Sequence, residues 1–244
     1  MLPGLYAAAS GMQAQQNQLD AVSNDLANES TPGYQSAIVG FRDLLYASGG
    51  APGGSPVATG TGAAASVIGR SQLQGTIQQT GQPLDVALQG EGYLEVRRPD
   101  GTNGLTRNGT LQVNSQGQLT TDLGMPLQPP ITLPSGVTPG EVTIAPDGAV
   151  TASGRKLGQI AIVTVPAPDG LLADGDSLFS ATAASGATRP ATGTTLQQGA
   201  LEASNVDVSQ DMIKMIDAEQ GYNLASKAIS DEQQMGQIAN QLRA

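Results

Sequence analysis

The residues of this chain that could carry chemistry are mostly carboxylates. There is no histidine and no cysteine among the 244 residues. Catalytic triads, thiolate nucleophiles and zinc sites built on sulfur are therefore excluded. Acid–base pairs remain conceivable at Asp217, Glu219, Asp231 and Glu232 near the C-terminus. Asp217 and Glu219 are two residues apart and would not share a helix face. We interpret these carboxylates as a solvated face or as contacts between subunits.

An acidic stretch in the second half of the chain superficially resembles a calcium-binding loop. Asp169 and Asp174 each precede a glycine. An EF-hand loop needs further oxygen ligands and a glutamate at its twelfth position. That position is Ser180 when counted from Asp169 and Ser185 when counted from Asp174. The stretch therefore predicts turns, and we expect neither a metal nor a cofactor.

Two further motifs could be read as binding sites. Gly90-Glu91-Gly92 suggests a nucleotide-binding loop, but the third glycine of that motif would fall at Glu95 and no helical pattern follows. A tight turn or bulge is the better interpretation. Arg97, Arg98 and Arg107 could form a cationic cluster for nucleic acid or cell wall. We favour a strand edge that charge protects from aggregation.

The overall composition narrows the class of protein. The net charge is −10 and aromatic residues make up 3% of the chain, with no tryptophan. Nucleic-acid binding needs clustered cations, and a glycosidase would lack an aromatic platform for its sugar. No apolar run reaches 18 residues, so direct membrane insertion is not expected. The first basic residue is Arg42, so the N-terminus lacks the positive region of a cleaved secretory signal.

Heptad patterns at both ends of the chain predict two long helices. Over residues 4–27, an apolar stripe recurs every seven residues at Leu5, Met12, Leu19 and Leu26. Pro32-Gly33 then stops the helix. Over residues 207–242, Asp207 is a plausible N-terminal cap. The stripe of this second helix comprises Val208, Met212, Met215, Tyr222, Ile229, Met235 and Leu242.

The two stripes admit two interpretations. The helices could simply pack on the rest of the protein. Each stripe is narrow, however, and a narrow apolar seam on a polar rod is typical of a coiled coil. We therefore predict that the helices pair with each other and with neighbouring chains.

The middle of the chain predicts β-structure. From residue 67 to 200, short apolar runs alternate with turn signals such as Pro146-Asp147-Gly148, at a spacing of roughly ten residues. With so few aromatic residues, the core must consist of Leu, Val and Ile. Residues 35–46 could form either a short helix or a strand. Residues 47–66 contain no charge and are rich in Gly and Ala, which predicts a flexible linker.

The expected fold class is thus α+β, with a mainly antiparallel β domain flanked by terminal helices that pair as a coiled coil. The expected boundaries are 1–46 for the N-terminal helical segment, 47–66 for the linker, 67–200 for the β domain and 201–244 for the C-terminal helix. Segments 1–46 and 201–244 together would form one helical domain.

The sequence resembles the bacterial flagellar rod and hook family. Four blocks carry the resemblance in the family's order along nearly the whole chain. They are residues 5–12 running into 23–28 (LYAAASGM and SNDLAN), residues 31–34 (TPGY), residues 84–93 with 105–109 (LDVALQGEGY and LTRNG), and residues 201–207 with 212–216 and 226–229 (LEASNVD, MIKMI and SKAI). Gly221 departs from the pattern, because the family tends to have a better helix former there.

The resemblance implies a mechanical role and no enzymatic activity. Members of this family are exported by the flagellar type III apparatus and assemble into a helical tube, with the terminal helices as its inner layer. The implied function is a structural subunit of the basal-body rod that self-assembles and transmits torque, in the distal rather than the proximal part of the rod. Its partners would be further copies of itself and other axial proteins of rod and hook. A proximal rod subunit and a monomeric, secreted cell-surface binding module remain the alternatives.

Overall fold

The computed structural model describes residues 2–44, 46–49, 57–134 and 136–241, and it divides into two compact units. Unit 1 comprises Met1–Ala27, Ala37–Ile68 and Asp207–Ala244. Unit 2 comprises Asn28–Ser36 and Gly69–Val206. The described elements are helices together with mainly antiparallel sheets, which confirms the α+β class.

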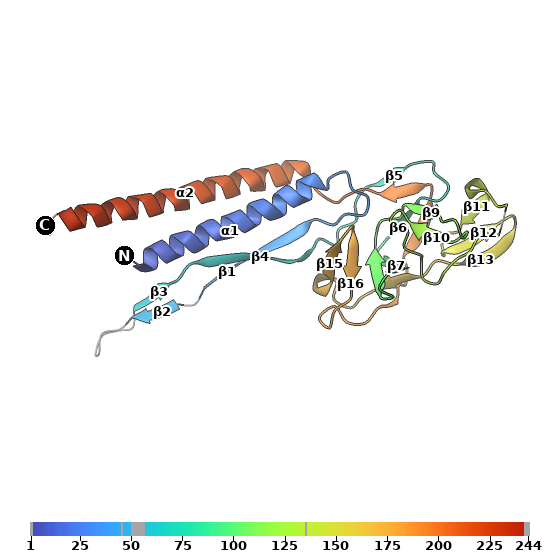
Figure 1. The fold of residues 1–244 in the computed structure, drawn as a ribbon, viewed down its shortest axis with the longest axis horizontal. Helices are drawn as coiled ribbons and strands as arrows, with labels where there is room; N and C mark the ends of the chain where they lie inside the picture. Colours follow the sequence, from blue (N-terminus) through green and yellow to red (C-terminus); the bar gives the residue numbers. More distant parts are fainter. Residues whose placement is uncertain (1, 45, 50–56, 135, 242–244) are drawn as a thin grey trace. The chain divides into compact units, whose positions relative to one another are not determined.

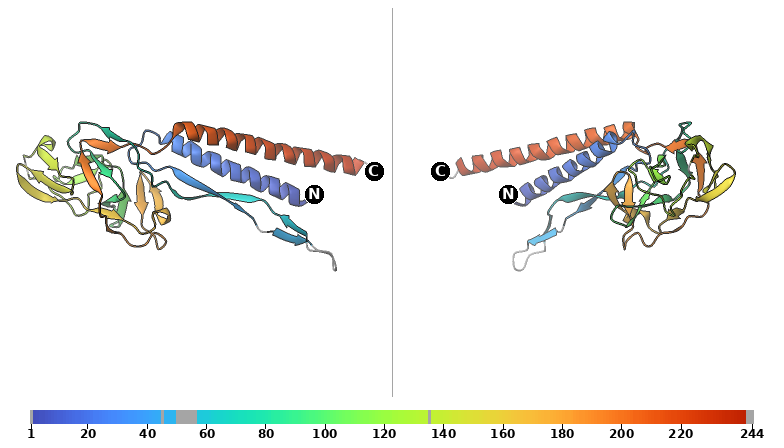
Figure 2. Two further views of the ribbon diagram at one scale, coloured as in Figure 1. Left: turned by 180° about the vertical axis from the view of Figure 1, so that it is seen from behind. Right: turned by 45° about the vertical axis from the view of Figure 1, so that its right-hand side comes forward.

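Unit 1 is built on two long helices, α1 (Leu2–Ala27) and α2 (Val208–Gln241), which lie side by side and antiparallel (Figures 1 and 2). A Cβ added to Gly4 would lie 3.0 Å from the Glu232 side chain, and one added to Gly221 would lie 2.8 Å from that of Gln15. The glycine that departs from the family pattern therefore gives room for α1. Over the described residues, neither helix is apolar enough along its length to span a membrane.

Local chemistry sets the ends of both helices close to where the sequence predicts them. The Asp207 carboxylate caps α2, because its Oδ1 accepts hydrogen bonds from the backbone N–H groups of Ser209 (3.0 Å) and Gln210 (3.2 Å). These N–H groups have no partner within the helix. Helix α1 ends at Ala27, ahead of the turn that contains Pro32 and Gly33.

Four short strands complete unit 1. They are β1 (Ala37–Asp43), β2 (Tyr46–Gly49), β3 (Val57–Gly60) and β4 (Ala63–Arg70), the last of which ends in unit 2. Strand β1 pairs with β4, and β2 pairs with β3. The open choice for residues 35–46 is thus settled in favour of a strand. The described part of residues 47–66 is also largely strand rather than flexible linker, because small side chains do not prevent backbone pairing; residues 50–56 lie outside the described residues.

Helix α1 is tied to β4 by side-chain hydrogen bonds. The Nδ2 of Asn17 donates to the carbonyl oxygen of Ala65 (2.8 Å), and the N–H of Ala63 donates to the Oγ of Ser10 (3.3 Å). Ala14 and Ala65 are buried. Helix α1 is therefore covered by α2 and by the strands, whereas α2 packs chiefly on α1.

Unit 2 is the β domain. Its described strands are β5 (Ile77–Gln79), β6 (Val86–Gln89), β7 (Tyr93–Arg97), β8 (Asn103–Thr106), β9 (Leu111–Val113), β10 (Leu119–Thr121), β11 (Val142–Ile144), β12 (Ala149–Ala152), β13 (Arg155–Gln159), β14 (Ile162–Thr164), β15 (Leu172–Gly175), β16 (Leu178–Ser180), β17 (Arg189–Pro190), β18 (Thr195–Gln198) and β19 (Ala200–Glu202). Two short 3₁₀ helices, Pro139–Glu141 and Pro168–Gly170, lie between strands.

The largest sheet of unit 2 has the strand order β15-β16-β8-β7-β14-β17. The unit also contains a three-stranded sheet, β11-β12-β13, and three strand pairs, β10-β9, β18-β6 and β19-β5. Each pairing with a determined register is antiparallel. The β19-β5 pair joins the segment just before α2 to residues 77–79, so the end of the β domain is held by a segment far away in sequence.

The core of unit 2 consists of two apolar clusters. The larger contains mostly Leu, Val and Ile, as the composition predicts, including Leu88, Leu127 and Ile160. The smaller contains Val163 and Val165 with Tyr93, Leu105 and Phe179. Ile160 and the valines therefore point into different clusters, because successive side chains of an extended segment face opposite ways.

Candidate functional site

The calcium-like stretch forms a hydrogen-bonded surface cluster. The Oδ2 of Asp174 in β15 accepts hydrogen bonds from Arg98 Nη2 (2.6 Å) and from the Ser180 hydroxyl. The Ser180 hydrogen bond, followed by that of Arg98 and its positive charge, holds the pKa of Asp174 below its usual value. Within the described residues, no three metal-ligating side chains come together. The carboxylate is thus engaged in linking β15 to the loop after β7.

We expect the contribution of Asp174 to the free energy of unfolding to depend on pH. A lowered carboxyl pKa stabilises the fold above the unfolded-state pKa, and this contribution is lost as the pH falls through the folded-state pKa. Asp174→Asn is expected to lower the free energy of unfolding at pH 7 by less than about 1 kcal/mol, because the pair is solvent-exposed. The difference from the parent protein should shrink as the pH is lowered in urea unfolding experiments. A difference that stays constant from neutral to acidic pH would contradict this account.

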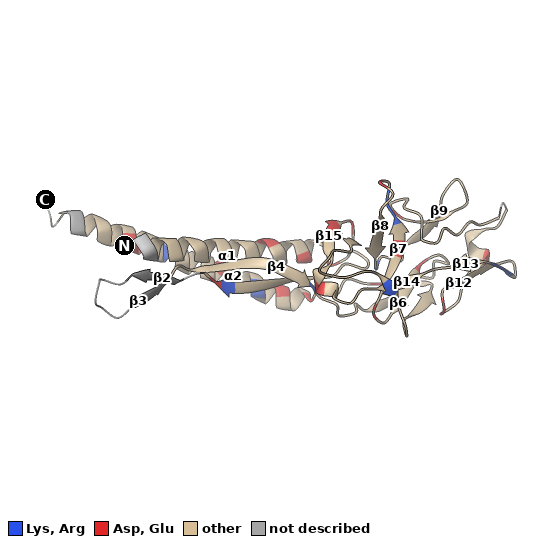
Figure 3. Cartoon of the chain, turned by 90° about the horizontal axis from the view of Figure 1, so that it is seen from below, with Lys and Arg blue, Asp and Glu red and all other residues tan. Residues whose placement is uncertain are grey.

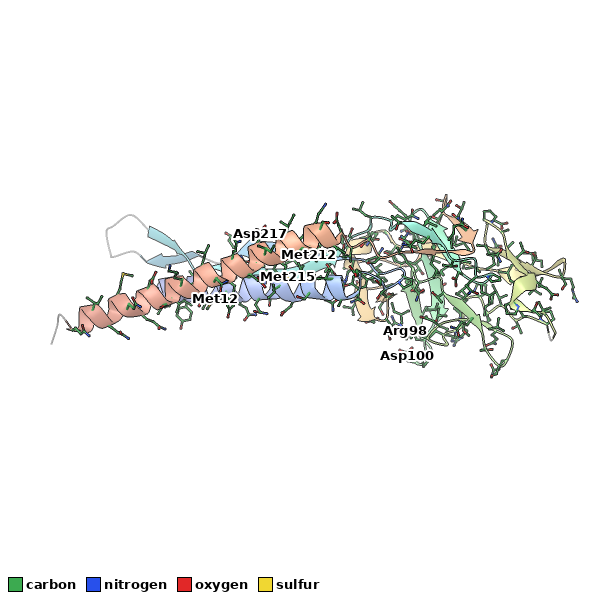
Figure 4. All side chains as sticks on the ribbon, turned by 90° about the horizontal axis from the view of Figure 1, so that it is seen from above. Met12, Arg98, Asp100, Met212, Met215 and Asp217 are labelled. Carbon is green, nitrogen blue, oxygen red and sulfur yellow. The ribbon has the colours of Figure 1, made fainter. Side chains whose placement is uncertain are left out.

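The carboxylates of α2 do not form an acid–base site. Asp217, Glu219 and Asp231 are exposed, and Glu232 is half-buried beside Gly4. Both acidic and basic residues occur on α2 (Figure 3). In Figure 4, Met215 lies on the side of α2 nearer to α1, whereas Asp217 projects from the opposite edge. The exposure of Asp217, Glu219 and Asp231 agrees with the interpretation of these carboxylates as a solvated face.

The structure corrects the interpretation of the three arginines. Strand β7, which ends at Arg97, pairs with β8 and β14 and is not an edge. Arg98 pairs with Asp174, and Arg107 is buried in an ion pair with Glu202. Sequence reasoning missed the Arg107–Glu202 pair, because a partner 95 residues away leaves no local signal.

A shallow pocket of about 370 Å³ lies in unit 2. Its lining includes Pro129, Ile160, Ile162 and Pro190, and Asp147 contributes its one charged side chain. The Asp147 carboxylate accepts a hydrogen bond from the Ala149 N–H (3.0 Å). A single engaged carboxylate provides no acid–base pair.

The members of the two predicted stripes differ in how far they are covered. The half-buried members, whose burial is consistent with the helix pair, are Leu5, Met12, Leu19, Leu26, Val208, Met215 and Ile229. Tyr222 is 41% exposed, and Met212 and Met235 are more exposed still, at 50% and 61%. Leu242 lies outside the described residues. Among the residues after Ile229 whose exposure is described, the less exposed are Glu232 and Gly236, so the face toward α1 keeps spacings of three and four residues instead of shifting to Met235.

Five exposed apolar side chains lie on one face of α2, where Lys227 and Asp231 interrupt them, and we call these five residues the outer stripe. It consists of Ile213, Ile216, Leu224, Met235 and Ile238, whose exposed fractions lie between 52% and 70%. Ile213, Leu224 and Met235 are eleven residues apart, close to three turns of about 3.6 residues each. The stripe lies roughly 160° around the helix from the half-buried positions Val208, Met215 and Ile229. A heptad pattern does not include this eleven-residue spacing, so the predicted stripes contain only Met235 of these five residues.

The strands of unit 1 carry further uncovered apolar side chains. Ile38 and Phe41 in β1, and Val67 and Ile68 in β4, are all exposed. Scattered surface apolar residues are ordinary, but a continuous set of them marks an interaction surface. Both α2 and the β1–β4 pair therefore present surfaces that a further protein could cover.

These features define a class of protein: a subunit of an assembly, whose long paired helices keep apolar surface uncovered. Family models match at both ends and in the β domain. They are the "Flagella basal body rod protein" at residues 5–35, the "Flagellar hook protein FlgE/F/G D1 domain" at 87–152 and the "Flagellar basal body rod FlgEFG protein C-terminal" at 197–242. The chain belongs to the flagellar basal-body rod protein family.

Curated relatives agree with this family over the whole chain. The flagellar basal-body rod protein FlgG of Caulobacter vibrioides is 38% identical, with 100% of both chains covered. FlgG of Borreliella burgdorferi is 36% identical over 100% of this chain and 99% of its own. FlgF of Salmonella typhimurium is 33% identical over 98% of this chain and 97% of its own. The resemblance found in the sequence is confirmed, and within the family the chain is most like the distal rod protein.

Proposed function

We propose that this chain is a structural subunit of the distal part of the flagellar basal-body rod and that it assembles through its terminal helices into a helical tube that transmits torque. Full-length similarity to relatives named FlgG supports the position in the basal body and the distal assignment. The observation that carries the assembly surface is the uncovered outer stripe on α2. The proximal rod remains the second candidate, because the FlgF relative also matches nearly the whole chain.

The outer stripe is long enough for another helix. From Ile213 to Ile238 it extends roughly 38 Å at about 1.5 Å per residue. Covering five large side chains that are more than half exposed would stabilise an assembly by on the order of 5 kcal/mol per subunit. Such a stripe would be a liability in a permanent monomer, and in a polymer it supplies the main attraction.

The arrangement of contacts also suits a tube. The half-buried face of α2 packs on α1, and the outer stripe lies on the opposite side of the helix. If the outer stripe of one copy contacts a different surface of another copy, the contact is heterologous. Heterologous contacts that do not close into a ring generate helical filaments. Other axial proteins of rod and hook would continue the same contacts at the ends of this segment.

We attribute the pairing of α1 and α2 to a coiled coil. Half-buried or buried positions of α2 recur at spacings of three or four residues, at Val208, Asp211, Met215, Ala218, Gly221, Ala225 and Ile229. Together with α1, these spacings support a helical domain built from both ends of the chain, as in unit 1, and a separate β domain, as in unit 2. Export through the flagellar type III apparatus would precede assembly, and the helices would then gain order on docking.

Seeded polymerisation tests this function. Purified full-length chain is mixed with seeds from isolated flagellar basal structures, and polymer is measured by sedimentation while helix content is followed by circular dichroism. We expect polymer mass and helix content to rise together, and variants lacking residues 1–27 or 207–244 to stay in the supernatant. A full-length chain that remains a helical monomer at every concentration, with or without seeds, would favour the secreted binding module.

A further inference from the structure

The chain crosses between its two units at four places, and all of them lie near one hydrogen-bonded cluster inside unit 2. The crossings fall between residues 27 and 28, 36 and 37, 68 and 69, and 206 and 207. The unit-2 segments that lead to them are residues 28–36, 69–76 and 199–206. Backbone and side-chain hydrogen bonds join these three segments, and we call this cluster the clasp, made of Gly33–Ser36, Ser71–Gly75, Arg107 and Glu202–Asn205.

Asn205 is the centre of the clasp. Its Nδ2 donates to the carbonyl oxygens of Ser71 (3.0 Å) and Leu73 (2.8 Å), and its Oδ1 accepts from the Ser36 N–H (2.7 Å). Its own N–H donates to the carbonyl oxygen of Tyr34 (3.3 Å). One residue thus links all three segments, and it lies three residues before α2 begins at Val208. A force applied through α2 or β1 reaches unit 2 within one or two residues of this amide.

A buried ion pair anchors the clasp in the β domain. Glu202 accepts from Arg107 Nε at Oε2 and from the Gly75 N–H at Oε1, both at 3.0 Å. The Glu202 carbonyl oxygen accepts from the Gly33 N–H (2.9 Å). A Cβ on Gly33 would lie 2.5 Å from the Arg107 carbonyl carbon, and its φ is +67°, so only glycine allows this approach. The short segment 28–36 is therefore pressed directly on the backbone beside the ion pair.

We propose that the clasp is the mechanical coupling through which force on the terminal helices and on β1 enters the β domain. This inference rests on the torque-transmitting function proposed above. The hydrogen bonds of the clasp join the three segments, so the segments resist tension together. No single segment can separate from the β domain before the others. Neither the motif blocks of the sequence nor the family matches assign a role to Asn205 or to the Glu202–Arg107 pair.

Single-molecule force spectroscopy on the full-length chain tests the clasp. The chain has no native cysteine, so Lys156→Cys in the β domain and Ser230→Cys in α2 give two unique, exposed attachment points. Tension then runs through residue 206 into the clasp. We expect Asn205→Ala to shorten the lifetime of the folded β domain at constant force by about tenfold, because three backbone groups lose their partner.

The matched control is Asn114→Ala. Asn114 also accepts hydrogen bonds from backbone N–H groups, those of Gln116 and Gln118 (both 2.9 Å), but it lies in the turn between β9 and β10. It should leave the lifetime under force unchanged. Equal lifetimes for the parent protein and Asn205→Ala would overturn the proposal.

Hydrogen exchange on the unmodified chain keeps the proposal falsifiable if Asn205→Ala does not fold. The amide protons of Gly33, Ser36 and Gly75 should exchange as slowly as those of the core strands β7 and β8. Rapid exchange at these three amides would mean that the clasp opens independently of the β domain and would refute the coupling. Seeded polymerisation of the same variants separates the clasp proposal from the proposed assembly function, because a chain without a working clasp should still form polymer.

Discussion

Replacing Leu224 with aspartate is expected to abolish polymerisation while leaving the β domain folded. Leu224 is the most exposed member of the outer stripe, at 70%, so the change removes little packing from the monomer. In an assembled interface it would bury a charge where an apolar side chain belongs, at a cost of about 3 kcal/mol or more per subunit. The critical concentration for seeded growth should therefore rise by at least about a hundredfold.

Ser230→Asp is the matched control for Leu224→Asp. Ser230 is exposed on the same helix and the substitution adds the same charge, but it lies about 120° away around α2. Its critical concentration should stay near that of the parent protein. If both variants polymerise normally, the outer stripe is not the assembly surface. If both fail equally, negative charge on α2 is the cause and the stripe itself is not.

Removing Arg107 should have the largest effect on stability. Arg107 and Glu202 have side chains that are 2% and 3% exposed, and Arg107 Nη2 also donates to the Gly90 carbonyl oxygen (3.0 Å). Burial raises the pKa of the Glu202 carboxyl, and the positive charge of Arg107 opposes that shift. Arg107→Met leaves a buried carboxylate without its counter-charge. The free energy of unfolding is expected to fall by about 3–5 kcal/mol, measured by urea unfolding and far-ultraviolet circular dichroism.

A second variant separates the loss of the charge pair from the loss of volume. Arg107→Met combined with Glu202→Gln keeps an acceptor for the Gly75 N–H and removes the buried charge, so it should recover at least half of the lost stability. Arg98→Met breaks the exposed pair with Asp174 and should cost less than about 1 kcal/mol. An Arg107→Met variant as stable as Arg98→Met would show that the buried pair contributes little to the fold.

The terminal helices and the β core could be predicted because their signals are local. The spacing of Leu5, Met12, Leu19 and Leu26 predicts a helix from its own period, and Asp207 caps the second helix through groups within three residues. The opposite orientation of Ile160 and Val163 follows from the alternation of an extended chain. The four motif blocks also predict membership of the flagellar rod and hook family, and the comparisons confirm it.

Only the tertiary structure decided which apolar residues of α2 are covered and what the buried polar residues do. Met215 and Met235 look alike in the sequence, yet one faces the helix pair and the other is exposed, because the face toward α1 depends on where the two helices touch. The sequence predicts Arg107 at an exposed strand edge, but the residue is buried against Glu202. Asn205 reads as one residue of a motif, but its partners at Ser36, Ser71 and Leu73 are far away in sequence. Contacts between distant segments depend on the folded arrangement of the whole chain, which periodicity and composition do not encode.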